Sequence, residues 1–138
     1  MSIEKQLGDL LARISFQTES APEALEAQVS GIVYDSRQAG PGRVFVCLRG
    51  ARADGHEYAK AAGEAGCCAV LAERPVETGG APLFLVSNTR EALAELSAAF
   101  FGRPAEELRV VGITGTKGKT TTAHMVRAIL EEAGIPTG

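Results

Sequence analysis

The sequence predicts an α/β fold, because apolar runs of strand length alternate with runs of helical periodicity. Where no helical run lies between two strand-like runs, a cluster of glycine and proline predicts a turn between them. Strands that alternate with helices imply a sheet that is at least partly parallel. The strand-like runs occupy residues 29–34, 44–48, 67–72, 83–86 and 110–114.

Composition places the chain among soluble globular proteins, since 45% of its 138 residues are hydrophobic and 22% are charged. The net charge of −3 with no basic cluster predicts no nucleic-acid partner. No apolar run approaches the roughly 20 residues that span a bilayer. The first six residues lack the apolar core of a secretion signal, so we expect a cytoplasmic protein with no membrane segment.

The cysteines are odd in number and lie in apolar runs, which predicts buried free thiols in a reducing compartment rather than disulfides. They are Cys47, Cys67 and Cys68. His56 and His124 have no ligand-like spacing to these thiols, so the sequence predicts no cysteine–histidine metal site.

In the first half of the chain, five apolar residues between Ile3 and Ile14 share one helical face, with Ser2 as the expected N-cap. Residues 15–28 are polar and are expected to form a loop. The strand predicted at 29–34 is weakened by Gly31. A turn runs from Asp35 through residues 36–42, and the apolar run at 44–48 suits a buried strand.

In the second half, a loop that contains Gly50 and Gly55 covers residues 50–56 and leads into a short helix over 58–65 that ends at Gly66. Strands at 67–72 and 83–86 flank a proline-containing linker. Asn88, with Glu91 three residues later, predicts the start of a helix that continues to Phe100. Residues 102–104 end this helix, and an acidic linker leads to the strand at 110–114.

A glycine-rich loop lies between that last strand and a final helix whose apolar residues recur from Ala123 to Ala133. Backbone N–H groups and the helix dipole at such a junction attract phosphate, and Lys119 adds a positive charge. The Thr120 hydroxyl stands where such loops offer a ligand to Mg²⁺. The residues expected to hold a nucleotide phosphate are Gly115, Thr116, Lys117, Gly118, Lys119, Thr120 and Thr121.

The match to the common phosphate-loop pattern is imperfect, because Ile113 stands where the strict pattern has its first glycine. The alternative is an ordinary strand-to-helix turn with a chance lysine. The β-branched run before the loop and the amphipathic helix after it favour phosphate binding. Since little but this helix follows the loop, we expect one domain over residues 1–105 and the opening, incomplete part of a nucleotide-binding domain over 106–138.

Two further loops follow predicted strands, at Asp35–Arg37 and at Gly50–His56. Open α/β sheets tend to bind ligands at the carboxyl ends of their strands, so both loops suit an anionic or nucleotide-like group. The alternative is structural: Asp35 caps a turn, Arg37 pairs with a neighbouring carboxylate, and His56 starts a helix.

These motifs together resemble the Mur ligase family. The resemblance rests on Asp35-Ser36-Arg37, on the run 41–50, on Asp54-Gly55-His56 and on the loop 112–121, in this order and spacing. Residues 100–104 resemble the family member that adds the third residue of the peptide. The sister ligase that adds the terminal dipeptide shares the first and third motifs and remains the alternative.

The resemblance implies three domains, of which the first holds the UDP end of the substrate and the second binds ATP. It implies UDP contacts by Tyr34, Ser36, Ala51, Arg52 and Ala53, and ATP contacts by residues 115–121. Lys119 is the implied catalytic residue and Thr120 a partial Mg²⁺ site. Lys117 stands where the family has asparagine, which puts in doubt any contact of an amide side chain there. A guanidinium at Arg52 suits a diphosphate oxygen.

The implied reaction joins diaminopimelate or lysine to UDP-MurNAc-L-Ala-D-Glu, with ATP activating the substrate carboxylate as an acyl phosphate. We expect this chain alone to bind UDP and to lack ligase activity. Three alternatives stay open: a non-catalytic nucleotide-binding module, a kinase or GTPase that shares only the phosphate loop, and a folate-polyglutamate ligase, which would not need the Asp35–Arg37 domain.

Overall fold

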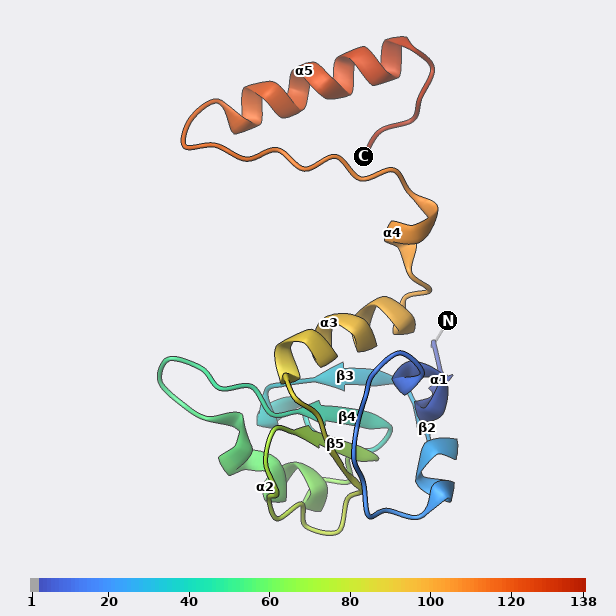
Figure 1. Cartoon of the computed structure of the whole chain (residues 1–138), viewed down its shortest axis with the longest axis vertical. Coiled ribbons are helices and arrows are strands. Elements are labelled where there is room, and N and C mark those ends of the chain that lie inside the picture. The colour runs from blue at the N-terminus through green and yellow to red at the C-terminus, as the bar shows by residue number, and fades with distance from the viewer. Residues whose placement is uncertain (1–2) are drawn as a thin grey trace. The chain divides into compact units, whose positions relative to one another are not determined.

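The computed structural model describes residues 3–138 of the chain (Figure 1). Its internal contacts divide the chain into two units, Met1–Pro104 and Ala105–Gly138.

A four-stranded parallel sheet forms the centre of the first unit. Its strands lie in the order β3 (Gly31–Val33), β4 (Arg43–Val46), β5 (Ala69–Ala72) and β6 (Leu83–Leu85). Every neighbouring pair is parallel, which confirms the α/β class with a parallel sheet. Residues 17 and 85 exchange both backbone hydrogen bonds at 2.9 and 2.8 Å, so the outer edge of β6 is partly covered.

Helices cover both faces of this sheet, with α3 (Thr89–Phe100) on one side and α2 (Ala59–Glu64) on the other (Figure 1). Successive strand residues point to opposite faces. On β4, Val44 and Val46 accordingly pack with α1 (Leu7–Leu11) and α3, whereas Phe45 packs with α2. Burial on both faces explains why these strands are continuously apolar.

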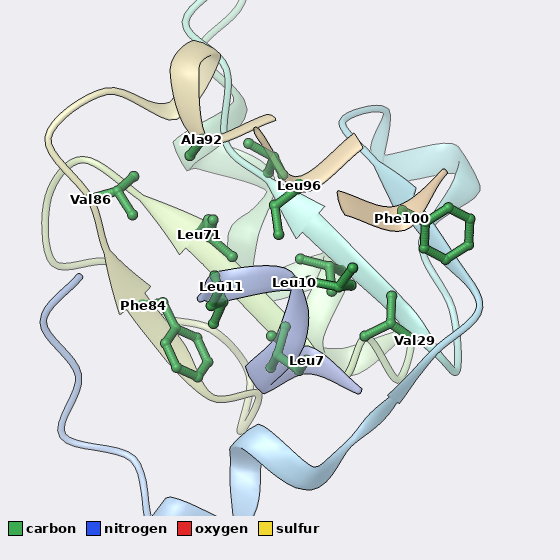
Figure 2. Close-up of a cluster of buried hydrophobic side chains, with 13 residues drawn as sticks. Leu7, Leu10, Leu11, Val29, Leu71, Phe84, Val86, Ala92, Leu96 and Phe100 are labelled. Carbon is green, nitrogen blue, oxygen red and sulfur yellow. The ribbon is translucent and has the colours of Figure 1, made fainter. Parts of the chain in front are cut away.

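The larger core lies between the sheet and the pair formed by α1 (Leu7–Leu11) and α3, as Figure 2 shows. Leu7, Leu10 and Leu11 of α1 are at most 2% exposed. Phe16 meets Phe84 of β6 edge to face, with ring centroids 5.2 Å apart. Each fully buried side chain of this size contributes about 1.5–3 kcal/mol of burial free energy.

The prediction of a helix from residue 3 to 14 was wrong in extent. Residues 5–6 form β1 (Lys5–Gln6), which pairs antiparallel with β2 (Gln28–Val29), and the helix is only α1. Backbone groups of residues 5–6 form hydrogen bonds to β2 instead of bonds within a longer helix. The tertiary contact therefore overrides the helical periodicity of the sequence. The proposed cap at Ser2 lies outside the described residues; α1 begins after Gln6 without a side-chain cap.

The single strand predicted at 29–34 is two strands that belong to different sheets. The backbone N–H of Ser30 donates to the carbonyl of Gly42 at 2.7 Å, which interrupts the run between β2 and β3. The first unit also contains the 3₁₀ turns η1 (Pro22–Glu26), η2 (Ser36–Gln38) and η3 (Gly55–Tyr58). The helix predicted at 58–65 is observed as α2, directly after η3.

The predicted start of α3 is confirmed. The side chain of Asn88 accepts hydrogen bonds from the backbone N–H groups of Arg90 and Glu91, at 3.0 and 3.2 Å. These are donors that the helix itself leaves without partners.

The short helix α4 (Pro104–Glu107) begins at the last residue of the first unit, and α5 (Lys119–Glu132) lies entirely in the second. The strand predicted at 110–114 was wrong: residues 109–115 carry no helix or strand, and Val110 and Val111 are exposed. A β-strand exists only through hydrogen bonds to a neighbouring strand, and no strand lies elsewhere within residues 105–138.

Among the helices of residues 3–138, none has the length and apolar character needed to cross a bilayer.

Candidate functional site

The carboxyl ends of the four parallel strands lie at one edge of the sheet, because parallel strands run in the same direction. The loops that leave this edge start after Val33, Val46, Ala72 and Leu85. Both loops singled out from the sequence are therefore on the edge where open α/β sheets bind ligands.

The turn after β3 is held by Asp35. Its carboxylate accepts from the backbone N–H of Arg37 at 3.0 Å and from the Arg37 guanidinium, including Nε at 2.9 Å. The Arg37 side chain lowers the pKa of Asp35 to about 2. The cap and the ion pair that the structural alternative expects are thus present. Tyr34 nonetheless remains 61% exposed beside this turn and is available to a ligand.

The loop after β4 extends away from the sheet (Figure 1), and backbone contacts close its base. Arg49 and Asp54 form an antiparallel bridge, and the Gly50 N–H donates to the carbonyl of Ala53 at 2.9 Å. The predicted UDP contacts Ala51–Ala53 lie at its exposed tip. Within residues 3–138, Arg52 makes no hydrogen bond or ion pair, so its guanidinium can bind an anion without first breaking a contact.

Asp54 is the centre of an ion-pair cluster at the base of this loop. Its Oδ1 atom accepts from the backbone N–H of His56 at 3.0 Å and lies 2.6 Å from the His56 ring. Its Oδ2 atom lies 3.0 Å from Arg74 Nη2 and 3.9 Å from Arg49 Nε. Hydrogen bonds from the His56 backbone and ring, followed by Arg74, hold the pKa of Asp54 well below its usual range. The carboxylate therefore stays ionised.

Hydrogen bonds link this cluster to the loops after β5 and β6. The Glu73 carboxylate accepts from the backbone N–H and hydroxyl of Thr89, at 3.0 and 3.1 Å, which lowers the pKa of Glu73. Arg90 donates to the carbonyl of Arg49 at 3.1 Å. Three of the four strand-end loops are thus tied into one network with an excess of arginine, an arrangement that suits a phosphate-bearing ligand.

The predicted phosphate loop lies in the second unit, immediately before α5. Gly118 is the residue before the helix and has φ 76°, and Gly115 has φ 153°. Side chains other than glycine rarely adopt these angles, so the turn requires both glycines. The first bond of the helical ladder runs from Thr122 N–H to Gly118 C=O at 2.9 Å. The N–H groups of residues 119–121 precede the ladder and are available to an anion.

All seven predicted phosphate-binding residues are exposed. Lys119 and Thr120 occupy the first turn of α5, where a cation and a hydroxyl stand beside the helix N-terminus. Among the residues described here, Thr120 supplies one oxygen suited to Mg²⁺, which prefers oxygen ligands and usually keeps several waters. The residues present therefore fit a phosphate group with a partial Mg²⁺ site.

A separate pocket of about 380 Å³ lies beside β6, lined by residues 17–20, Pro75, Ala81, Leu83 and Leu85. Thr18 donates to the carbonyl of Leu83 at 2.6 Å in its wall. This pocket includes none of the residues that the sequence assigns to nucleotide binding, so it is not part of the candidate site.

Family models match both units of the chain. Residues 28–101, more than half of the 138, match the catalytic domain of the Mur ligase family, and residues 113–138 match the Mur ligase middle domain. The chain belongs to the Mur ligase family.

Among curated relatives, this Mur ligase chain is 47% identical over 133 residues to the UDP-N-acetylmuramoyl-L-alanyl-D-glutamate–2,6-diaminopimelate ligase of Syntrophomonas wolfei. The match covers 96% of this chain and 27% of the relative. The chain therefore spans about a quarter of the length of that Mur ligase.

Solved Mur ligase structures share the fold. A crystal structure of MurF from Acinetobacter baumannii matches with a TM-score of 0.71 at 28% identity, over 95% of this chain and 28% of that one. MurF ligase from Thermotoga maritima in complex with ADP matches with a TM-score of 0.56 at 33% identity, over 73% of this chain and 23% of that one.

Several residues of the strand-end network were not among the predicted site residues of this Mur ligase chain. Arg49, Asp54, Glu73 and Arg74 contact one another or their neighbours across as many as 20 positions of sequence. A signal for one of them was available: Asp54 followed two residues later by His56 is the pattern of an Asp-capped turn. Glu73 and Arg74 directly follow a buried strand, where ligand-edge residues are expected.

Proposed function

We propose that the whole protein is an ATP-dependent ligase of peptidoglycan precursor synthesis. It joins diaminopimelate or lysine to UDP-MurNAc-L-Ala-D-Glu through an acyl phosphate formed on the substrate carboxylate. The observation that carries this proposal is the presence, in one chain, of a polar strand-end network and a glycine-bounded phosphate loop. The 47% identity to a diaminopimelate ligase supports the substrate class.

In this proposal, residues 1–105 form the UDP-binding domain. Tyr34 and Ser36 contact the uridine from the turn after β3, and Ala51–Ala53 contact the diphosphate from the tip of the next loop. The unpaired Arg52 guanidinium supports this assignment, because a planar, permanently charged fork matches two phosphate oxygens. The ionised Asp54 is already engaged by His56 and Arg74, which limits its repulsion of the diphosphate.

Residues 106–138 begin the ATP-binding domain. The central difficulty of the reaction is electrostatic, since a carboxylate must approach a triphosphate. Lys119 and the N–H groups at the start of α5 stabilise the charge that develops during phosphoryl transfer. Thr120 would hold Mg²⁺ in part, and the ion would neutralise phosphate charge there. The ADP complex of the Thermotoga maritima relative supports an adenine nucleotide as ligand.

Adding the terminal dipeptide, as the sister ligase does, is the second candidate. The similarity to MurF structures favours it only at the level of the shared fold, at 28% and 33% identity. The higher identity to a diaminopimelate ligase favours addition of the third residue. We place the protein in the cytoplasm, where ATP and the UDP-linked precursor are found together.

Calorimetric titration of the 138-residue chain with UDP and with Mg²⁺-ATP tests these assignments separately. We expect Arg52→Ala to weaken UDP binding about ten- to a hundredfold, because a charge-assisted hydrogen bond contributes about 1.5–3 kcal/mol, and to leave ATP binding unchanged. Lys119→Ala should weaken ATP binding and leave UDP binding unchanged. A kinase or GTPase that shares only the loop would show no UDP binding, and that result would overturn the proposal.

We predict that the 138-residue chain alone has no ligase activity. Its second unit supplies one phosphate loop and one long helix, and α5 has no buried side chain, so no closed catalytic cleft surrounds Lys119 within residues 105–138. The measurement is product formation from ATP, the UDP-linked dipeptide and a diamino acid, with a full-length diaminopimelate ligase such as that of Syntrophomonas wolfei as the positive control. Detectable tripeptide product from the 138-residue chain would contradict this prediction.

A further inference from the structure

His56 is buried and connects two strand-end loops through both nitrogens of its ring. Its side chain is 0% exposed. Nδ1 lies 2.6 Å from Asp54 Oδ1, and Nε2 accepts a hydrogen bond of 2.9 Å from the backbone N–H of Glu73. Both ring nitrogens of this buried side chain thus have hydrogen-bond partners, so His56 contributes specific hydrogen bonds as well as volume.

The contact with Glu73 determines which ring nitrogen carries the proton. A backbone N–H can only donate, so Nε2 must be unprotonated. The proton of the neutral ring is then on Nδ1 and is donated to Asp54. The short contact with Asp54 is therefore a hydrogen bond from a neutral histidine to a carboxylate, and it requires no charge on the ring.

These two bonds fix the base of the loop that carries Arg52. Asp54 forms the bridge with Arg49 that closes the loop, and Glu73 directly follows β5 of the sheet. Glu73 is in turn held by Thr89 at the start of α3. Through these hydrogen bonds, the ring connects the base of the loop to the sheet and to α3. Residues 49–53 of the loop are all exposed, so no buried side chain of their own holds them in place.

We propose that His56 is a positioning residue for the diphosphate of the UDP-linked substrate. It acts through the loop Gly50–Ala53, whose tip it holds in the geometry that binds phosphate. Preorganisation of this kind strengthens binding because the loop loses less conformational entropy when the ligand arrives. This inference rests on the proposed function, since it assumes that the loop binds UDP.

Replacing His56 with asparagine separates positioning from packing. The asparagine amide keeps a donor near the position of Nδ1, and its side chain is too short to accept from Glu73 N–H. His56→Asn therefore cuts the link between the loop and the sheet. Val29→Ala serves as the matched control, because it removes volume from a fully buried position in β2, before the amino end of β3 and away from the carboxyl edge.

The experiment measures the UDP dissociation constant by calorimetry and the thermal midpoint for the unsubstituted chain and both variants. We expect His56→Asn to weaken UDP binding at least tenfold, and Val29→Ala to lower the midpoint with less than a twofold change in UDP affinity. An unchanged UDP affinity in His56→Asn, or an equal loss in the two variants, would overturn the positioning role. No UDP binding by the unsubstituted chain would overturn the proposed function, and this inference with it.

A measurement on the unsubstituted chain tests the same arrangement even if His56→Asn does not fold. Long-range proton–nitrogen NMR spectra distinguish a protonated from an unprotonated ring nitrogen. We expect an unprotonated Nε2 at neutral pH, and we expect UDP to shift the backbone amide signals of residues 51–53. Protonation at Nε2 would exclude the hydrogen bond from Glu73 and would refute the link between loop and sheet.

Discussion

Gly63 lies inside α2, at a place where an added Cβ atom would be 1.5 Å from the carbonyl oxygen of Thr78. Nothing in the sequence marks this close approach, because the position reads as an ordinary turn of a helix. The neighbour is a backbone atom of the segment between β5 and β6, 15 residues later in the chain, which cannot move aside as a flexible side chain would.

We predict that Gly63→Ala lowers the free energy of unfolding by about 1–3 kcal/mol or more, the usual cost of forcing extra atoms into a packed site. Gly40→Ala is the matched control, since a Cβ atom there has no neighbour within 4 Å and the substitution should not lower stability; an unstrained Gly→Ala change raises it by about 0.4–1 kcal/mol. Urea denaturation of both variants provides the measurement. Equal stabilities would show that the contact with Thr78 relaxes freely.

Cys47 is a buried thiol, as the sequence predicted for the cysteines. It is 0% exposed, and burial, followed by the charge of Asp54, raises its pKa to about 12. Of the other two, Cys67 is buried as expected, whereas Cys68 is half-buried and donates to the carbonyl of Arg43. All three are free thiols.

We predict that Cys47 does not react with a thiol reagent in the native chain, because the reactive thiolate is scarce far below its pKa and the sulfur is inaccessible. A chain with Cys67→Ala and Cys68→Ala leaves Cys47 as the one thiol to be followed. Reaction should occur only after unfolding in denaturant, which serves as the positive control. Stoichiometric labelling of the folded chain would contradict the burial of Cys47.

Side-chain pairs close in the sequence can be predicted, whereas pairs that depend on the order of the strands cannot. Asp35 and Arg37 are two residues apart, and their pairing could be foreseen. Arg74 reaches Asp54 across 20 positions, and His56 reaches Glu73 across 17, so these partners depend on the order of strands in the sheet. A single sequence shows no such order before the fold is known.

At the scale of elements, local signals succeeded where the element is defined by its own residues. The helix α3 was predicted from its cap and its apolar spacing, and both are present. The predictions were wrong for elements that depend on a pairing partner. Residues 5–6 form a strand because β2 pairs with them, and residues 110–114 form no strand because none lies beside them in their unit. Pairing, rather than propensity, decided these two cases.

The cap of α3 gives a prediction at this scale. We expect Asn88→Ala to lower the free energy of unfolding by about 1 kcal/mol, since the backbone N–H groups of Arg90 and Glu91 lose their acceptor. Asn88→Asp keeps an acceptor oxygen at the helix N-terminus and should retain most of the stability. Thermal unfolding monitored by circular dichroism compares the three chains. Equal destabilisation by both substitutions would indicate that the cap contributes little.

For the whole molecule, the two units differ in how much they bury. In the first unit, the sheet is covered on both faces and α3 buries Thr89, Ala92, Leu96 and Phe100. In the second unit, α5 has no buried residue, and Met125 and Ile129 are more than 60% exposed. The sequence predicted both helices from the same kind of periodicity, and periodicity alone does not reveal whether a helix has anything to pack against.

This difference predicts very unequal protection of backbone amides. An isolated helix of 14 residues is marginal in water, so amides of α5 should be protected roughly tenfold or less from hydrogen exchange. Amides of α3, a helix of 12 residues, should be protected about a thousandfold or more, because they open only with the packed core. The comparison is matched, since the two helices are similar in length and differ in burial.

Exchange measured with added Mg²⁺-ATP extends the same experiment to function. A ligand that binds only the folded loop and helix stabilises them in proportion to its concentration above its dissociation constant. Protection should therefore rise in the first turn of α5, at residues 119–122, and stay unchanged in β4 and β5. Protection of α5 equal to that of α3 without ligand would show that its exposed apolar face is packed in solution. No change with Mg²⁺-ATP would argue against a phosphate site at Lys119.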